Sequence, residues 1–165
     1  KHTQGDSRRG EKNNSLNSAL IQQLGAAFTS IPFNQMLGLR LDHLDEQFAC
    51  MSFNMKNELI GNFLHGILHG GVISSVLDMA GGILVMASSM HKHPDAGMEE
   101  LEQIVGKCST IDLQVSYLRP GHGNIFTAKA WLLKSGHKIA FTRMELFNEK
   151  ESLIATGSGT YMQGS

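Results

Sequence analysis

Residues 69–82 read HGGVISSVLDMAGG, a His-Gly-Gly step followed, nine residues after the histidine, by the carboxylate of Asp78. The apolar residues after the glycines predict a long helix that begins at the glycine pair. Unpaired backbone N–H groups and the positive end of the helix dipole stabilise negative charge there. Asp78 is the only charged residue between His69 and His91, and a carboxylate in apolar surroundings is unfavourable unless it is paired or used. The stretch therefore combines an anion-binding helix end with a carboxylate.

The segments around this helix predict its surroundings. Apolar residues on all sides of a helix require cover on all sides. Strand-like segments flank it at residues 36–44, 47–55, 106–118, 124–134, 138–148 and 153–162. Short breaks between the last three predict an antiparallel meander. We expect an α+β fold in which a curved six-stranded antiparallel sheet wraps around one long central helix, and a second copy of the chain completes the cover.

Gly70 and Asp78 are too far apart to serve one site within one chain. Nine residues of helix span roughly 13.5 Å, at about 1.5 Å per residue. A site that uses both groups is therefore expected to be shared between two copies. This predicts a homodimer, with a tetramer built as a dimer of dimers as its extension.

The remaining segments predict a single domain over residues 15–165, preceded by a mobile polar tail over residues 1–14. Apolar residues spaced three and four apart over 15–29 fit an amphipathic helix, and Ile31-Pro32-Phe33 ends it. Residues 56–68 are expected as a loop. Residues 91–103, with Pro94 and Gly97, are expected as an excursion before the next strand.

Composition excludes several classes of protein. The 165 residues carry 14 basic and 15 acidic side chains and a net charge of −1, so no positive field favours nucleic acid. Residues 70–90 approach the length of a membrane span, but Asp78, the serines and the lack of basic flanks favour a buried helix. The first 14 residues are polar and lack the apolar stretch of a secretory signal, and the two cysteines are isolated. We therefore expect a cytoplasmic protein with no nucleic-acid or membrane partner.

Two motifs resemble those of a known family. The first is His69-Gly70-Gly71 with Asp78, within the run NFLHGILHGGVI over residues 62–73. The second is STIDLQVSYLRP over residues 109–120. Together, over residues 20–162, they resemble the PaaI-like acyl-CoA thioesterases of the hotdog fold, most closely the YigI-type branch. The resemblance implies hydrolysis of acyl-CoA thioesters without a cofactor or metal.

The resemblance also implies catalytic roles. Gly70 would donate its backbone N–H to the thioester carbonyl, and His69 would orient the loop before the helix. Asp78 of the partner subunit would act as general base or nucleophile. Thr110 matches a position where some relatives position water with a hydroxyl group. An oxyanion donor of the Gly70 kind is worth about 2.7–4 kcal/mol in acyl transfer.

Further residues are expected around the substrate. Asn62 or His65 matches an asparagine that the family carries upstream of the His-Gly-Gly step. Gly71 and His65 are expected to contact substrate. Arg119 either meets a phosphate of coenzyme A or serves the turn in which it lies.

Each assignment has a plain structural alternative. Asp78 could stabilise a helix contact, His69 could cap the helix, and Thr110 could be an ordinary strand residue. His65 and His69 have the spacing of helical zinc ligands, but the glycines between and after them disfavour a metal. Two alternative functions fit the same scaffold: a hydratase or dehydratase acting on acyl-CoA, and a non-catalytic acyl-CoA binding module.

Overall fold

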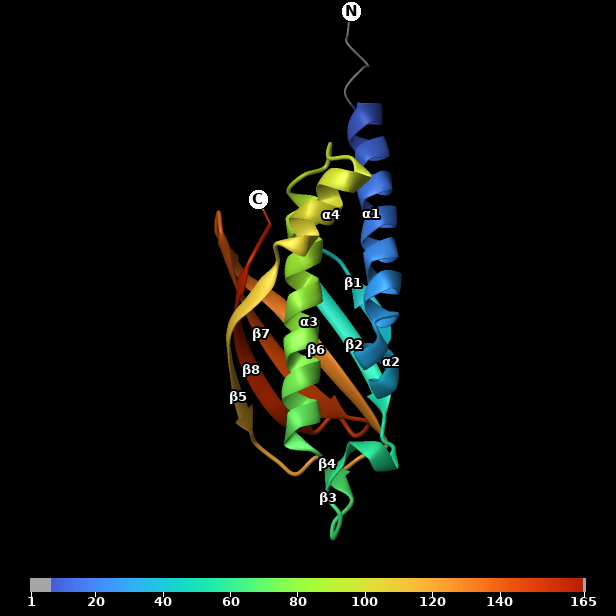
Figure 1. Ribbon diagram of the computed structural model, residues 1–165, viewed down its shortest axis with the longest axis vertical. Coiled ribbons are helices and arrows are strands. Elements are labelled where there is room, and N and C mark those ends of the chain that lie inside the picture. Colours follow the sequence, from blue (N-terminus) through green and yellow to red (C-terminus); the bar gives the residue numbers. More distant parts are fainter. Residues whose placement is uncertain (1–6, 165) are drawn as a thin grey trace, which may run out of the picture.

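A computed structural model describes residues 7–164 of the chain. Figure 1 shows a long helix lying against a strongly twisted sheet, with further helices on the same side. In chain order the elements are α1 (Ser7–Thr29), α2 (Pro32–Leu37), β1 (Arg40–Leu44), β2 (Phe48–Asn54), the 3-10 turn η1 (Asn57–Leu59), β3 (Ile60–Asn62), β4 (Ile67–Leu68), α3 (Gly70–His91), α4 (Met98–Gly106), β5 (Ser109–Tyr117), β6 (Ile125–Ser135), β7 (Ile139–Asn148) and β8 (Leu153–Met162).

The main sheet has six strands in the order β1-β2-β6-β7-β8-β5, and every neighbouring pair is antiparallel. This confirms the predicted sheet and the meander of its last three strands. Burial alternates along β7, where Ala140, Thr142, Met144 and Leu146 are buried. Such alternation places one face of the sheet in the core.

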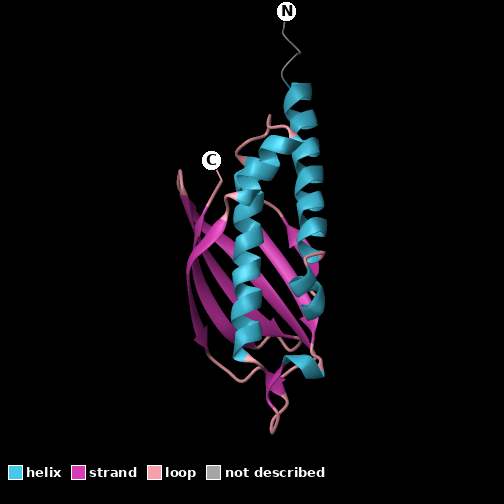
Figure 2. Cartoon of the chain, viewed as in Figure 1, coloured by secondary structure: helices cyan, strands magenta, loops and turns pink. Residues whose placement is uncertain are grey.

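Helix α3 covers that buried face (Figure 2). Val76, Leu77, Ile83 and Leu84 are fully buried, which confirms the predicted core helix. By length and composition α3 could cross a membrane, yet half of its most apolar window is buried inside the protein. A second side of the helix, which includes Met79 and Met86, is only half-buried in a single chain.

The N-terminal helix is longer than the sequence pattern predicts. Residues 7–14, expected as part of a polar tail, continue α1, whereas residues 1–6 of that expected tail lie outside the described residues. Arginine, lysine and glutamate favour helix nearly as well as leucine does. A helix already nucleated over residues 15–29 extends at little cost. Apolar periodicity, on which the prediction relied, is not required for such an extension.

Two other predictions were wrong because short elements leave no periodic pattern. Residues 36 and 37, expected in a strand, are the last residues of α2, which begins at Pro32. The helix is followed by its C-cap, Gly38, which has a left-handed φ of 69°. Proline suits the first turn of a helix. The predicted loop at 56–68 contains η1 and the β3–β4 hairpin.

Helix α4 begins within the predicted excursion at residues 91–103, before the first of the four late strands, and continues to Gly106. Glu99 and Glu100 lie in its first turn, where the helix dipole favours acidic groups. Leu101 and Ile104 are buried on its inner side. Strand β5 accordingly begins at Ser109 rather than at Gly106.

Candidate active site

His69 is the N-cap of α3. Its backbone is extended, with φ −62° and ψ 133°, and its Nδ1 accepts a hydrogen bond of 2.8 Å from the N–H of Gly71. The neutral ring therefore carries its proton on Nε2. The histidine thus performs the capping role weighed as its structural alternative, and it fixes the start of the helix.

Gly70 follows this cap and faces its own cavity. The N–H of Gly71 is used by His69, so Gly70 provides the first helical N–H group outside that capping bond. Tyr117 donates its hydroxyl proton to the carbonyl of Gly70 at 3.0 Å. A cavity of about 340 Å³, lined by Gly70, Tyr117 and Arg119 among others, opens beside this helix end.

Asp78 lies two turns further along α3 and is held by two hydroxyl groups. Thr110 donates to its Oδ1 at 2.9 Å, and Tyr161 donates to the same oxygen at 3.1 Å. The Tyr161 hydroxyl also lies 3.1 Å from the Asp78 backbone carbonyl. Both contacts are made to Oδ1, so they orient the Asp78 side chain through one of its two oxygens.

Tyr161 is a hydrogen-bond donor toward Asp78. Burial raises the pKa of its hydroxyl far above the usual range, and the Asp78 carboxylate raises this pKa further. The phenol therefore keeps its proton throughout the range in which proteins function. It donates to Asp78 and does not itself act as a base.

Two glycines make room for the Tyr161 ring. A Cβ atom on Gly81 of α3 would overlap the Tyr161 hydroxyl, and one on Gly159 of β8 would overlap the ring edge. Gly82 is different, because the nearest atom to a Cβ there would be Tyr161 Cε1 at 3.8 Å. The close approach of helix and strand at Tyr161 thus depends on Gly81 and Gly159.

This difference predicts opposite effects for two neighbouring substitutions. Gly81→Ala should lower the free energy of unfolding by about 1–3 kcal/mol, because the added methyl group overpacks a buried site. Gly82→Ala should leave stability unchanged or raise it by up to about 1 kcal/mol, since alanine favours helix over glycine. Urea denaturation followed by circular dichroism measures both. Equal stabilities of the two variants would contradict the packing argument.

Within one chain, Gly70 and Asp78 line separate cavities, as the rise of the helix predicts. Asp78, Thr110 and Tyr161 line a cavity of about 150 Å³, which shares no lining residue with the Gly70 cavity. Strand β5 passes both: Thr110 lies near its beginning and Tyr117 at its end. Gly70 and Asp78 therefore do not face one common cavity within a single chain.

The other predicted residues lie in the β3–β4 hairpin before α3 and in the segment after β5. Asn62 closes the β3–β4 turn, where its Oδ1 accepts from the N–H of Leu64 at 3.0 Å and its carbonyl from Gly66 at 2.9 Å. It lines neither cavity. His65 is exposed in the same turn. Arg119 donates from its guanidinium to the carbonyl of Leu153 at 2.8 Å.

Sequence reasoning missed both tyrosines. Tyr161 occupies an alternate, inward position of the last strand, where a tyrosine is expected to seek a hydrogen-bond partner. That signal was present but did not indicate Asp78 as the partner. In the part of the chain that the structure describes, no group of three or more His, Cys, Asp or Glu residues could hold a metal ion.

A known family model covers the residues of this candidate site. Residues 65–155, which contain His69, Gly70, Asp78 and Thr110, match the family model of the thioesterase superfamily. The chain belongs to this superfamily. The protein is accordingly a thioester hydrolase.

Individual relatives agree with the family assignment. A protein of Salmonella typhimurium named medium/long-chain acyl-CoA thioesterase YigI is 46% identical over 134 residues, 81% of this chain and 86% of the relative. A crystal structure from Shewanella oneidensis, described as related to the thioesterase superfamily, superposes with a TM-score of 0.86 at 40% identity. It covers 90% of this chain and 98% of the other. The Escherichia coli PaaI protein shares the fold, with a TM-score of 0.71 at 19% identity over 87% and 92% of the two chains.

Proposed function

We propose that the protein hydrolyses acyl-CoA thioesters to a free acid and coenzyme A, and that its substrates carry medium or long acyl chains. The observation that carries this proposal is Asp78, a carboxylate oriented by Thr110 and Tyr161 in a cavity beside the core helix. The YigI relative bears the name of this activity. The helix end at Gly70 supplies the complementary donor.

The chemistry requires both groups at one thioester. In one route Asp78 takes a proton from water while the hydroxide adds to the carbonyl carbon. In the other its free oxygen adds to the carbonyl carbon, loss of the coenzyme A thiolate leaves an anhydride, and water then cleaves that anhydride. In both routes the Gly70 N–H stabilises the negative charge on the former carbonyl oxygen. The carbon–sulfur bond breaks when this charge returns to the carbonyl, and the thiolate takes a proton from Asp78 in the first route and from water in the second.

Pairing through strand β5 would bring Asp78 of one chain close to Gly70 of a second chain. Strand β5 is an edge strand of the sheet, it is mostly exposed, and Ile111 and Tyr117 are about half exposed. Exposed edge strands are suited to pairing with a second chain. Antiparallel pairing of β5 with its two-fold mate brings the Thr110 end of one copy to the Tyr117 end of the other. Asp78 then approaches the partner's Gly70.

A second apolar surface supports association of dimers. Leu133, Ile139, Phe141 and Met162 are exposed large side chains at one end of β6, β7 and β8. Ile139 and Met162 are direct partners in the sheet, so they share its outer face. This patch is on the side opposite α3 and is suited to the second interface of a dimer of dimers.

Arg119 is proposed to bind a phosphate of coenzyme A. Its side chain is exposed at the rim of the Gly70 cavity. One guanidinium nitrogen is anchored on the carbonyl of Leu153, which leaves other donors of the fork for an anion. The site needs neither a cofactor nor a metal in this proposal.

Complementation between two inactive variants tests the shared site. Asp78→Asn lacks the carboxylate, and Gly70→Pro lacks the backbone N–H. Co-expression should restore about a quarter of wild-type turnover, because half of randomly mixed dimers are mixed and each has one intact site of two. Thiol release from acyl-CoA by the co-expressed mixture measures this recovery, and the doubly tagged, purified mixed dimer should reach about half of wild-type turnover.

If the site lies within one chain, the same mixture should recover no turnover, and that result would contradict the shared-site proposal. A stable monomer at micromolar concentration in light scattering would do so as well. Binding of acyl-CoA without turnover by the wild-type protein would favour the non-catalytic module instead. No histidine lines the described Asp78 cavity, so nothing there favours a hydratase.

A further inference from the structure

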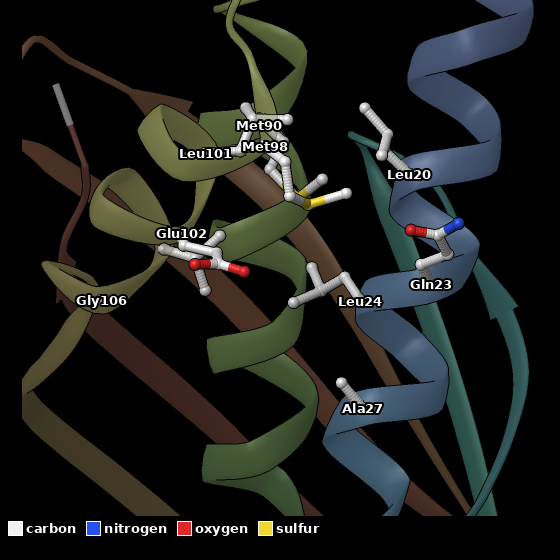
Figure 3. Close-up of a pocket in the computed structure, with 10 residues that line it drawn as sticks. Leu20, Gln23, Leu24, Ala27, Met90, Met98, Leu101, Glu102 and Gly106 are labelled. Atoms are coloured by element: carbon white, nitrogen blue, oxygen red, sulfur yellow. The ribbon is translucent and has the colours of Figure 1, made fainter.

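A separate apolar groove lies between α1, α4 and the C-terminal half of α3. Its volume is about 400 Å³. Figure 3 shows Leu20 and Leu24 of α1 facing Met90 of α3 and the Met98 side chain of α4. Gln23 and Glu102, on opposite walls, are its polar lining residues. Neither the helix cap nor the Asp78 contacts explain this groove.

The groove adjoins the Asp78 cavity on three elements. Ala27 of α1 lines the groove, and the next residue, Phe28, lines the Asp78 cavity. On α3, Met90 lines the groove and Met86, one turn earlier, lines the cavity. Gly106, the last residue of α4, lines the groove, and Cys108, two residues later, lines the Asp78 cavity. The two hollows are therefore neighbouring parts of one surface.

A single stripe of α3 connects them. Asp78, Gly82, Met86 and Met90 follow one another at intervals of four residues, which places them on one side of the helix. From Asp78 to Met90 the helix rises by about 18 Å. Carbon–carbon bonds of about 1.5 Å meeting near 111° advance an extended alkyl chain by about 1.25 Å per carbon. The stripe thus matches a chain of roughly 14 carbons.

We propose that this groove holds the distal part of the substrate's acyl chain. The inference rests on the proposed function, since it places the thioester at Asp78 and directs the acyl chain along the stripe away from the helix N-terminus. The first carbons contact Gly82 and Met86, and later carbons pass Ala27 to reach Met90, Leu24 and Met98. Methionine side chains adapt to flexible apolar ligands, which suits a site for chains of several lengths.

Ala27 controls access to the groove in this arrangement, because on α1 it is the groove residue next to Phe28 of the Asp78 cavity. Ala27→Trp should lower kcat/KM for tetradecanoyl-CoA by at least about tenfold, since each methylene that leaves water favours binding about fourfold. The same variant should change kcat/KM for butyryl-CoA by less than about twofold, because a short chain ends before Ala27. Ala27 is exposed in the single chain, so the fold tolerates the larger side chain.

Ala26→Trp is the matched control, because Ala26 is exposed on α1 and lines neither hollow. It should act as wild type on both substrates. Met98→Glu, at a position 53% exposed, should repeat the selective loss by placing a charge in the groove. Equal losses on both substrates, or no loss on either, would overturn the proposal. A groove that holds a second protein chain predicts unchanged chain-length dependence and an altered oligomer mass.

A wild-type protein that hydrolyses neither substrate would refute the proposed function while leaving the groove testable. Calorimetry then compares binding of tetradecanoyl-CoA and butyryl-CoA, below the micelle concentration of the longer one. Tighter binding of the long chain that Ala27→Trp abolishes supports the groove as the acyl site. Affinity independent of chain length overturns it.

Discussion

Asp78→Asn is expected to lower kcat by a factor of about 10² or more, because it removes the group that activates water or attacks the thioester. Asparagine preserves the shape of the side chain. Its Oδ1 still accepts the protons of Thr110 and Tyr161, which both bond Asp78 Oδ1. Folding and oligomer mass should therefore persist. Thiol release from acyl-CoA, alongside light scattering and circular dichroism, measures the three properties.

Two comparisons make this result specific. Asp78→Ala should lose at least as much activity, whereas Thr110→Ala should lose less, because Tyr161 still holds Asp78. If Asp78→Asn retains near wild-type hydrolysis of several acyl-CoAs, Asp78 is a structural residue. A variant that fails to assemble would instead assign the acid to the interface between copies.

Long elements with strong patterns were predictable from the sequence. Helix α3 follows from a nearly unbroken apolar run after a glycine pair, and the six strands follow from alternating segments separated by turn residues. Asp78 was identifiable as a candidate functional residue, because a single carboxylate in an apolar run is unfavourable unless it has a partner or a function. The separation between Gly70 and Asp78 could be predicted from the rise per residue of a helix alone.

Features that depend on tertiary contacts were not predictable in the same way. Tyr161 reaches Asp78 across 83 positions of sequence, and only the packing of β8 on α3 makes the contact. Helix α4 has nine residues, too few for a decisive periodic signal beside Pro94 and Gly97. Its position over the end of α3 (Figure 1) nevertheless creates one wall of the apolar groove. The position of such a short helix is determined by its tertiary contacts and not by a local sequence pattern.

Gly70→Pro is expected to lower kcat by about 10²–10³, the usual effect of losing one oxyanion donor. Gly70 is the first residue of α3, a position where proline is favoured because its missing N–H has no partner within the helix. The residue before a proline must be extended, and His69 already has a ψ of 133°. The substitution therefore removes one N–H group while preserving the helix start. Steady-state kinetics on acyl-CoA, with thermal unfolding as a check of the fold, measure it.

Gly70→Ala is the matched control, because it keeps the N–H and adds the same Cβ atom. That atom would lie 3.3 Å from Cε1 of Tyr117, a close contact that a small movement of an exposed ring relieves. Alanine should therefore retain activity within about tenfold, so that the N–H and not the added carbon separates the two variants. If both variants lose activity equally, steric exclusion of substrate from the Gly70 cavity explains the loss. If both retain it, the thioester oxygen is stabilised elsewhere and Gly70 only begins the helix.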